Sequence, residues 1–147
     1  MAYCSSFKAD QVIVHTGRFT ADEIFVVAML RTIKPDLKII FDNDVNNAKQ
    51  MAKNIGEIAV DLGIYCKTPN IPCSTAWDLF GHDICKDEKS FAAIRDDIVQ
   101  EIVNRDSIAY KMEMFNPGYN NHIPYVMAFH KAIVWVQWLI KAYIDNI

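Results

Sequence analysis

The sequence predicts an α/β fold in which a small parallel β-α-β-α-β sheet is followed by a helical C-terminal half. Over the first 63 residues, short runs rich in β-branched residues alternate with helical patterns, whereas the later residues show helical patterns alone. The chain has 147 residues, 52% of them hydrophobic, and shows no repeat, low-complexity tract or flexible linker. We therefore expect a single globular domain over residues 1–147.

The first strand is expected at residues 11–16, where QVIVHT is a short β-rich run. Thr20 and Glu23 have the spacing of a capping box, in which the Thr hydroxyl accepts from the Glu amide and the Glu side chain reaches back. A helix should follow over residues 21–33, where the apolar residues form a stripe, and Pro35 should end it.

Two more strands are expected at residues 37–41 (LKIIF) and 57–63 (EIAVDLG). A polar helix from about residue 45 to 54 should connect them, and Gly56 should end it. Because a helix lies between each pair of successive strands, we expect right-handed crossovers and parallel pairing.

The second half of the chain is predicted to be helical. Ser74 is expected to cap a helix that ends at Gly81. A longer amphipathic helix is expected over residues 89–105, a loop over 114–124 and a final helix over 125–144.

Charge and hydropathy exclude some classes of function. The net charge of −3 gives no basic field that would hold a long duplex nucleic acid by phosphate contacts. The apolar stretch 125–144 is interrupted by charged and polar residues, so it makes a poor membrane span. The N-terminal residues MAYCSSFKAD do not have the pattern of a signal peptide, and a cytoplasmic location is therefore expected.

The cysteines are spaced irregularly and form no CxxC motif, so we interpret them as reduced thiols. A zinc site is an alternative, but its spacing matches no common zinc motif. Its ligands would be Cys66, Cys73, Cys85 and His82.

Ionisable residues gather where the predicted strands end. His15 ends the first strand, Asp42 and Asp44 follow the second, and Asp61 ends the third. Asp22 lies in the first turn of the helix after His15. Ligands bind beyond the carboxyl ends of the strands in open α/β sheets. Carboxylates with one imidazole suit a divalent cation such as Mn²⁺ or Mg²⁺.

Each of these residues also has an ordinary structural interpretation. A histidine after a strand commonly bonds a neighbouring backbone group, and Asp22 would be favoured by the helix dipole alone. Asp61 is less easily explained in this way, since it lies within an apolar run, where a buried carboxylate must be paired or bind a cation.

Several short motifs are similar, in the same order, to those of the Myg exonuclease family, an outlying branch of the DHH phosphoesterases. HTGRFTADE (15–23) resembles that family's H-N-G-x-F-H-x-D-E opening, and IAVDLG (58–63) resembles its V-V-D-V-G segment. Three later segments are similar to its remaining motifs: PCSTAWDLFG (72–81), IVNRDSI (102–108) and FHKAIVWVQWLI (129–140).

The resemblance implies a DHH-phosphoesterase-like α/β domain whose metal is held by four residues. These are His15, Asp22, Asp61 and Asp106, with His15 and Asp61 also in catalytic roles. In such enzymes Mn²⁺ or Mg²⁺ activates water for attack on a phosphodiester, and two metals clamp the attacking and leaving oxygens.

The chain also departs from the family pattern. The D-H-H triplet is absent, because the corresponding interval reads IYCKTPNIP, and Thr16 and Thr20 stand where the family has Asn and His. The family's second domain has no counterpart in these residues. The resemblance therefore implies a reduced, metal-dependent phosphoesterase-like domain acting on a nucleotide or short oligonucleotide.

Two alternatives follow from these departures. The first is a non-catalytic protein that sequesters a nucleotide, holding phosphate at the helix N-termini around residues 20–23 and 74–76 and stacking the base on Phe19, Tyr65 or Tyr119. Its predicted nucleotide-binding residues are Arg18, Phe19, Thr20, Lys67, Ser74, Thr75 and Arg105.

The second alternative is an interaction module. The final predicted helix carries Trp135 and Trp138 three residues apart, and with Tyr143 they would form the partner surface. Because aromatic residues crowd this helix, we expect a homo-oligomer, most simply a two-fold dimer, in all three cases.

Overall fold

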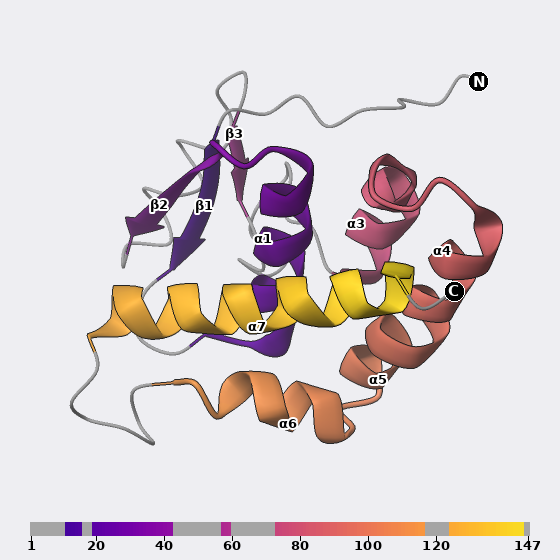
Figure 1. Cartoon of the computed structure of the whole chain (residues 1–147). Helices are drawn as coiled ribbons and strands as arrows, with labels where there is room; N and C mark the ends of the chain where they lie inside the picture. The colour runs from indigo at the N-terminus through magenta and orange to yellow at the C-terminus, as the bar shows by residue number, and fades with distance from the viewer. Residues whose placement is uncertain (1–10, 16–18, 43–56, 60–72, 117–123, 146–147) are drawn as a thin grey trace.

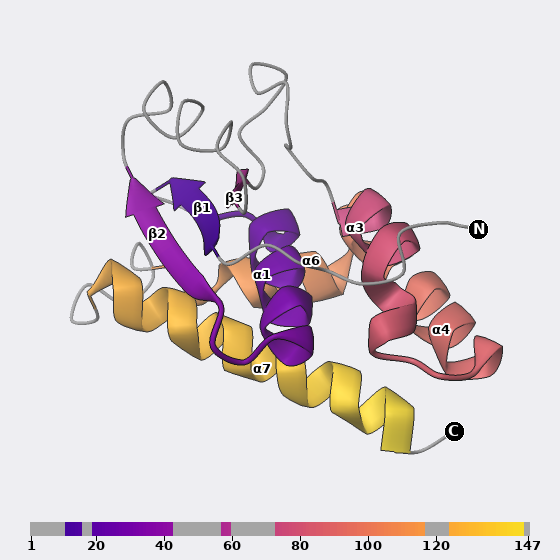
Figure 2. The same cartoon turned by 90° about the horizontal axis from the view of Figure 1, so that it is seen from above.

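The computed structural model describes residues 11–15, 19–42, 57–59, 73–116 and 124–145 (Figure 1). Three short strands lie on one side of helix α1, and a group of helices made from the second half of the chain lies on its other side. The long helix α7 runs past both groups, as Figures 1 and 2 both show. The chain is thus a mixed α/β protein that is mostly helical.

The sheet consists of β1 (Gln11–His15), β2 (Lys38–Asp42) and β3 (Glu57–Ala59), in the order β2-β1-β3. Both pairings are parallel, as predicted. β1 is therefore the central strand, with β2 on one side of it and β3 on the other. The predicted helix at 45–54 and the predicted strand residues 60–63 lie outside the described residues.

Helix α1 (Ala21–Ile33) has the predicted bounds. Its capping box is present: the Glu23 N–H donates to Thr20 Oγ1 (3.3 Å), and the Thr20 N–H donates to Glu23 Oε1 (3.2 Å). The predicted apolar stripe is wider than one face, because every residue of 23–30 is buried. A helix that is apolar all round requires neighbours on every side.

Helix α3 (Cys73–Phe80) covers one side of α1, with Trp77 against Phe25 (ring centroids 6.0 Å apart). The prediction that Ser74 caps this helix is wrong, because α3 already includes Cys73 and Ser74 lies within its first turn. A 3₁₀ turn, η2 (Gly81–Asp83), follows α3 where the sequence predicts its end.

The predicted helix at 89–105 is a succession of three segments. These are α4 (Glu88–Ile94), the π-helical turn η3 (Arg95–Val99) and α5 (Gln100–Val103). The helix begins one residue earlier than predicted because Asp87 caps it, accepting from the Ser90 N–H (2.8 Å). Arg105 then adopts a left-handed conformation (φ 59°), which ends the helical run.

Helix α6 (Ser107–Glu113) is not predicted from the sequence. It packs against α1, α5 and α7. The predicted loop after it is described only at residues 114–116 and at Pro124.

Helix α7 (Tyr125–Asp145) extends one residue beyond its predicted end. Its buried residues recur at helical spacing, as Phe129, Ile133, Val136 and Ile140 illustrate, and they face α1, α4 and α6. Phe41 of β2 contacts Phe129 edge-on (5.2 Å), which joins the sheet to the helical half. Within the described ranges, no helix combines the length and apolar character that a membrane span requires.

Candidate functional site at the start of helix α1

The start of α1 lies beyond the carboxyl end of β1. The chain leaves β1 at His15, whose register partner is Asp42 at the end of β2, and it enters α1 through Phe19 and Thr20. The strand order is β2-β1-β3, so the chain passes from the central strand β1 to β2 on one side, and the next strand in the chain, β3, lies on the other side of β1. Such a reversal is where ligands bind in open α/β sheets.

Asn116 holds the backbone of Phe19 from a position 97 residues later in the chain. Its Oδ1 accepts from the Phe19 N–H (2.9 Å), and its Nδ2 donates to the Phe19 carbonyl (2.9 Å). A third bond, from Nδ2 to the Glu113 carbonyl (3.0 Å), fixes the amide within its own segment. The approach to α1 is therefore anchored to the turn after α6.

Glu113 brings a carboxylate to the first turn of α1. The Ala21 N–H donates to Glu113 Oε2 (2.9 Å). Arg105 donates to the same carboxylate through Nη1 (to Oε2) and Nη2 (to Oε1), both at 3.0 Å. These hydrogen bonds raise the pKa of Arg105. The Arg105 side chain is about half exposed (53%), whereas that of Glu113 is nearly buried (11%).

Asp22 joins the start of α1 to the start of α3. Its Oδ1 accepts from the Cys73 N–H (2.9 Å), so a carboxylate of α1 caps α3. Burial raises the pKa of the Cys73 thiol, and the hydrogen bond and charge of Asp22 raise it further. Cys73 is therefore a protonated thiol at neutral pH. The charge of Asp22 also makes a small contribution to the raised pKa of Arg105.

An aromatic cluster closes the site on the side of α7. The ring of Phe19 lies 5.5 Å from that of Phe129 and 5.7 Å from that of Tyr125. Burial raises the pKa of Tyr125, and the charge of Glu23 raises it further. Phe19 is fully buried, so the prediction that its ring stacks on a base is wrong: the ring packs inside the protein.

The predicted metal ligands are described to different extents. Asp22 is half-buried in the first turn of α1, and Asp106 is exposed at the N-cap position of α6, where its side chain makes no capping hydrogen bond. His15 is the last residue of β1, and only its backbone is described. Asp61, like Asp44, lies outside the described residues. Among those that are described, no three His, Cys, Asp or Glu side chains form a group that could hold a metal.

The alternative zinc site divides into separate contacts. His82 bonds Glu88 (2.7 Å) and stacks on Phe91, whereas Cys85 is buried beside Ser90. Cys73 contacts Asp22, and Cys66 lies outside the described residues. The described part of the chain therefore does not support a zinc site at these positions.

The residues predicted to bind a nucleotide fall into three groups. Arg18 and Lys67, with the stacking candidates Tyr65 and Tyr119, lie outside the described residues. At the start of α1, the Thr20 hydroxyl accepts from the Glu23 N–H, and the Ala21 N–H donates to the Glu113 carboxylate. These groups therefore cap the helix within the protein itself. The remaining three are accessible, namely Ser74 and Thr75 in the first turn of α3 and the guanidinium of Arg105.

Glu113 and Asn116 are the residues that sequence reasoning missed. Their partners lie 92 and 97 positions away, so no local spacing points to them. The only signal is their setting in AYKMEMFN (109–116), where single polar residues stand among apolar ones. No protein-family model, curated protein or solved structure matches this chain.

Proposed function

We propose that this chain is a reduced metal-dependent phosphoesterase that acts on the phosphate of a nucleotide or short oligonucleotide at the start of α1. One observation carries the proposal. Asp22 is oriented by the Cys73 N–H, and the residue before it, Ala21, donates its N–H to Glu113, the carboxylate that holds the half-exposed Arg105. These groups lie at the start of α1, beyond a parallel sheet whose strand order reverses. The start of α1 thus combines a fixed carboxylate with a fixed guanidinium, which provide one group for a cation and one for a phosphate.

The metal ligands of this proposal are His15, Asp22, Asp61 and Asp106. One imidazole with three carboxylates suits Mn²⁺ or Mg²⁺, and a bound metal would lower the pKa of a water molecule to make it a nucleophile. The backbone hydrogen bond from Cys73 is the kind of outer contact that orients a ligating carboxylate. Arg105 would neutralise the phosphate, with Glu113 holding its guanidinium in one orientation.

A second candidate is binding without hydrolysis, and a different observation favours it. The Arg105 guanidinium and the exposed Ser74 and Thr75 in the first turn of α3 offer a cation and two hydroxyl donors that require no metal. A phosphate held by these groups would leave the protein unchanged. The chain would then sequester a nucleotide.

The test is to incubate purified protein with Mn²⁺ and a panel of mono-, di- and cyclic nucleotides, and to separate the products by chromatography. The variants are Asp22→Asn and His15→Ala. The matched control is Asp145→Asn, because Asp145 is an exposed aspartate at the far end of α7 in an ion pair with Lys141 (3.5 Å). Bound metal in the purified protein is measured in parallel.

Hydrolysis requires more than one product molecule per chain, with activity lost in Asp22→Asn and His15→Ala and kept in Asp145→Asn. Stoichiometric depletion of a nucleotide that is recovered intact after denaturation would favour the binding candidate instead. Neither turnover nor depletion with any nucleotide would reject both.

A further inference from the structure

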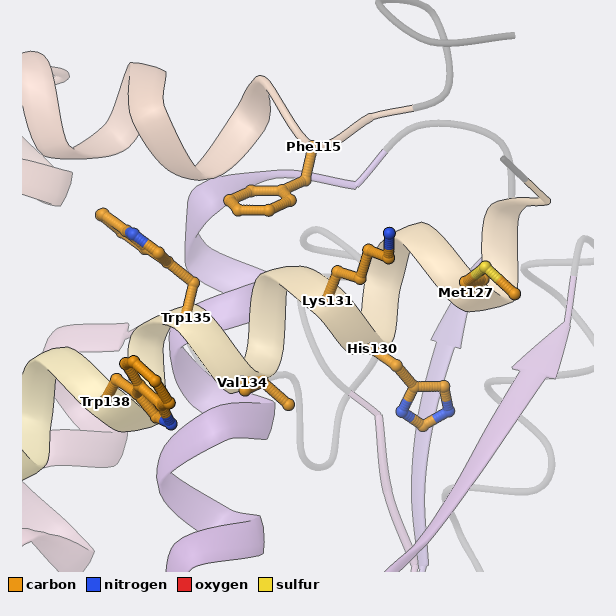
Figure 3. A pocket seen from close by; sticks show the side chains of 7 residues that line it. All are labelled: Phe115, Met127, His130, Lys131, Val134, Trp135 and Trp138. Carbon is orange, nitrogen blue, oxygen red and sulfur yellow. The ribbon is translucent and has the colours of Figure 1, made fainter. Parts of the chain in front are cut away.

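The outer face of α7 carries apolar side chains that no described element covers. Trp138 is 75% exposed, and Met127 and Val134 are each about half exposed. A groove of about 480 Å³ runs along this face between α7 and the end of α6 (Figure 3). Phe115 and Trp135 form its inner wall, with ring centroids 6.2 Å apart. Trp138 therefore stands as a projection beside a groove on the same surface.

The spacing along this face is that of a helix that pairs with another helix. Met127, Val134 and Lys141 are seven residues apart, and Lys131 and Trp138 lie between them. Such alternating steps of three and four residues place one straight row on an α-helix. A second hollow, lined by Arg31, Pro35 and Gln137 among others, flanks the row on its other side.

We propose that two copies of this chain associate through this face, with their α7 helices antiparallel and the two-fold axis at Val134. In this arrangement, a residue that lies a given number of positions after Val134 in one copy faces the residue that lies the same number of positions before Val134 in the other copy. Trp138 of one copy then meets His130 of the other, at the mouth of the groove. The contact is isologous, since each copy contributes both the projection and the groove.

Charge selects the antiparallel orientation. In a parallel, in-register pair, Lys131 would face Lys131 and Lys141 would face Lys141, and such like-charge pairs are destabilising. In the antiparallel pair, Lys131 faces Gln137 and Lys141 faces Met127, so neither cation meets its own copy. The indole of Trp138 also comes within reach of the Lys131 ammonium, a favourable cation–π arrangement.

The chemistry of the groove fits an indole. Its lining is almost entirely apolar, with Met127, Val134 and Phe115 along its length. Burial lowers the pKa of His130, and the charge of Arg31 lowers it further. The imidazole is therefore neutral at pH 7, and it presents a flat ring to the incoming side chain.

The first experiment measures the mass of the full chain in solution by light scattering and sedimentation over a range of concentrations. A dimer has twice the chain mass of 16.8 kDa. Val134→Glu places two carboxylates at the axis, and we expect the dimer to be lost. The matched control is Val103→Glu, because Val103 is also a half-exposed helical valine but lies on α5. We expect this control to stay dimeric.

The second experiment tests the orientation by cysteine cross-linking in a Cys4→Ser, Cys66→Ser background. Val134→Cys should form a disulfide with its own copy, because both residues lie at the axis. Met127→Cys and Lys141→Cys should each fail alone, since 14 residues of helix place the paired positions about 21 Å apart. They should cross-link when the two variants are mixed, because position 127 then faces position 141.

Each outcome decides the proposal. A protein that is monomeric at all concentrations overturns it and leaves the face for another partner or for a segment of this chain. A dimer that persists in Val134→Glu places the interface elsewhere. A dimer in which Met127→Cys cross-links with itself is parallel, which overturns the charge argument.

Discussion

Helices α1 and α7 are both rich in apolar residues, but their surroundings differ. In α1 every residue of 23–30 is buried, because the helix packs against α3, α6 and α7. In α7 buried residues alternate with exposed ones at helical spacing, so that one face packs on the protein and the other is open. The sequences already differ in this respect: α1 contains the uninterrupted run IFVVAML (24–30), whereas Lys131, Gln137 and Lys141 interrupt α7. An uninterrupted run therefore indicates enclosure, and a periodic one indicates a single covered face.

The largest expected effect tests this contrast with neighbouring residues. In α1, Met29→Ala and Leu30→Ala should each lower the free energy of unfolding by about 2–5 kcal/mol, because both side chains are fully buried. In α7, Ile133→Ala should cost a similar amount, whereas Val134→Ala should stay within about 0.5 kcal/mol. Urea unfolding measures all four variants. Equal costs for Ile133→Ala and Val134→Ala would mean that something covers the outer face, as the proposed dimer does at high concentration.

The next effect concerns how the start of α1 is held. Asn116→Ala removes two buried hydrogen bonds to the Phe19 backbone. The N–H and the carbonyl of Phe19 then lose these partners. We expect a loss of about 2–3 kcal/mol in urea unfolding. Asn104→Ala is the matched control, since its side-chain bond to Gln100 is exposed and should contribute less than about 0.5 kcal/mol. Similar losses of unfolding free energy in the two variants would show that the hydrogen bonds between Asn116 and Phe19 stabilise the fold no more than an exposed side-chain bond does.

A smaller effect tests how α3 covers α1. A Cβ at Gly81 would lie 2.7 Å from Phe91 and 2.8 Å from Trp77, the ring that packs against Phe25 of α1. Gly81→Ala should therefore cost about 1–3 kcal/mol through displacement of these rings. Thermal unfolding followed by tryptophan fluorescence would measure it. An unchanged melting temperature would show that the two rings move aside freely.

The smallest effect appears only at alkaline pH. It concerns the contact between Tyr125 of α7 and the start of α1. Burial and the charge of Glu23 hold the pKa of Tyr125 above its ordinary value of 10.0, so the unfolded chain ionises first as the pH rises. The stability from the neutral phenol is complete below pH 10 and is lost as the pH rises above it. The free energy of unfolding, measured with urea at a series of pH values, should decrease less steeply with pH in Tyr125→Phe than in the parent. Tyr110→Phe is the matched control, because Tyr110 is an exposed tyrosine.

Local signals predicted much of the fold. The capping box and Pro35 gave the bounds of α1, and the periodic apolar residues gave α7 to within one residue. Helix α6 was missed because it is only seven residues long and forms where its buried face meets α1 and α7. The cap of α3 was assigned to Ser74 because its true cap, Asp22, lies 51 positions earlier in the chain.

The candidate site could be predicted only in part. Asp22 was correctly placed in the first turn of α1, since that position depends on the capping box nearby. The partners that surround it, Cys73, Arg105 and Glu113, come from three later segments, and no local pattern reveals which of them converge. The metal-ligand set stays a prediction, because only Asp22 and Asp106 have described side chains.

The hydrogen bonds between Asn116 and Phe19 also affect how this protein is made. Synthesis proceeds at roughly 5–20 residues per second. The 97 residues between these partners therefore separate their emergence by about 5–20 s. During that time the apolar residues of α1 lack the helices that enclose them in the finished protein. Newly made chains should thus be prone to aggregation and to chaperone binding until α6 and α7 leave the ribosome. If translation stopped before that point, the apolar surface of α1 would stay exposed.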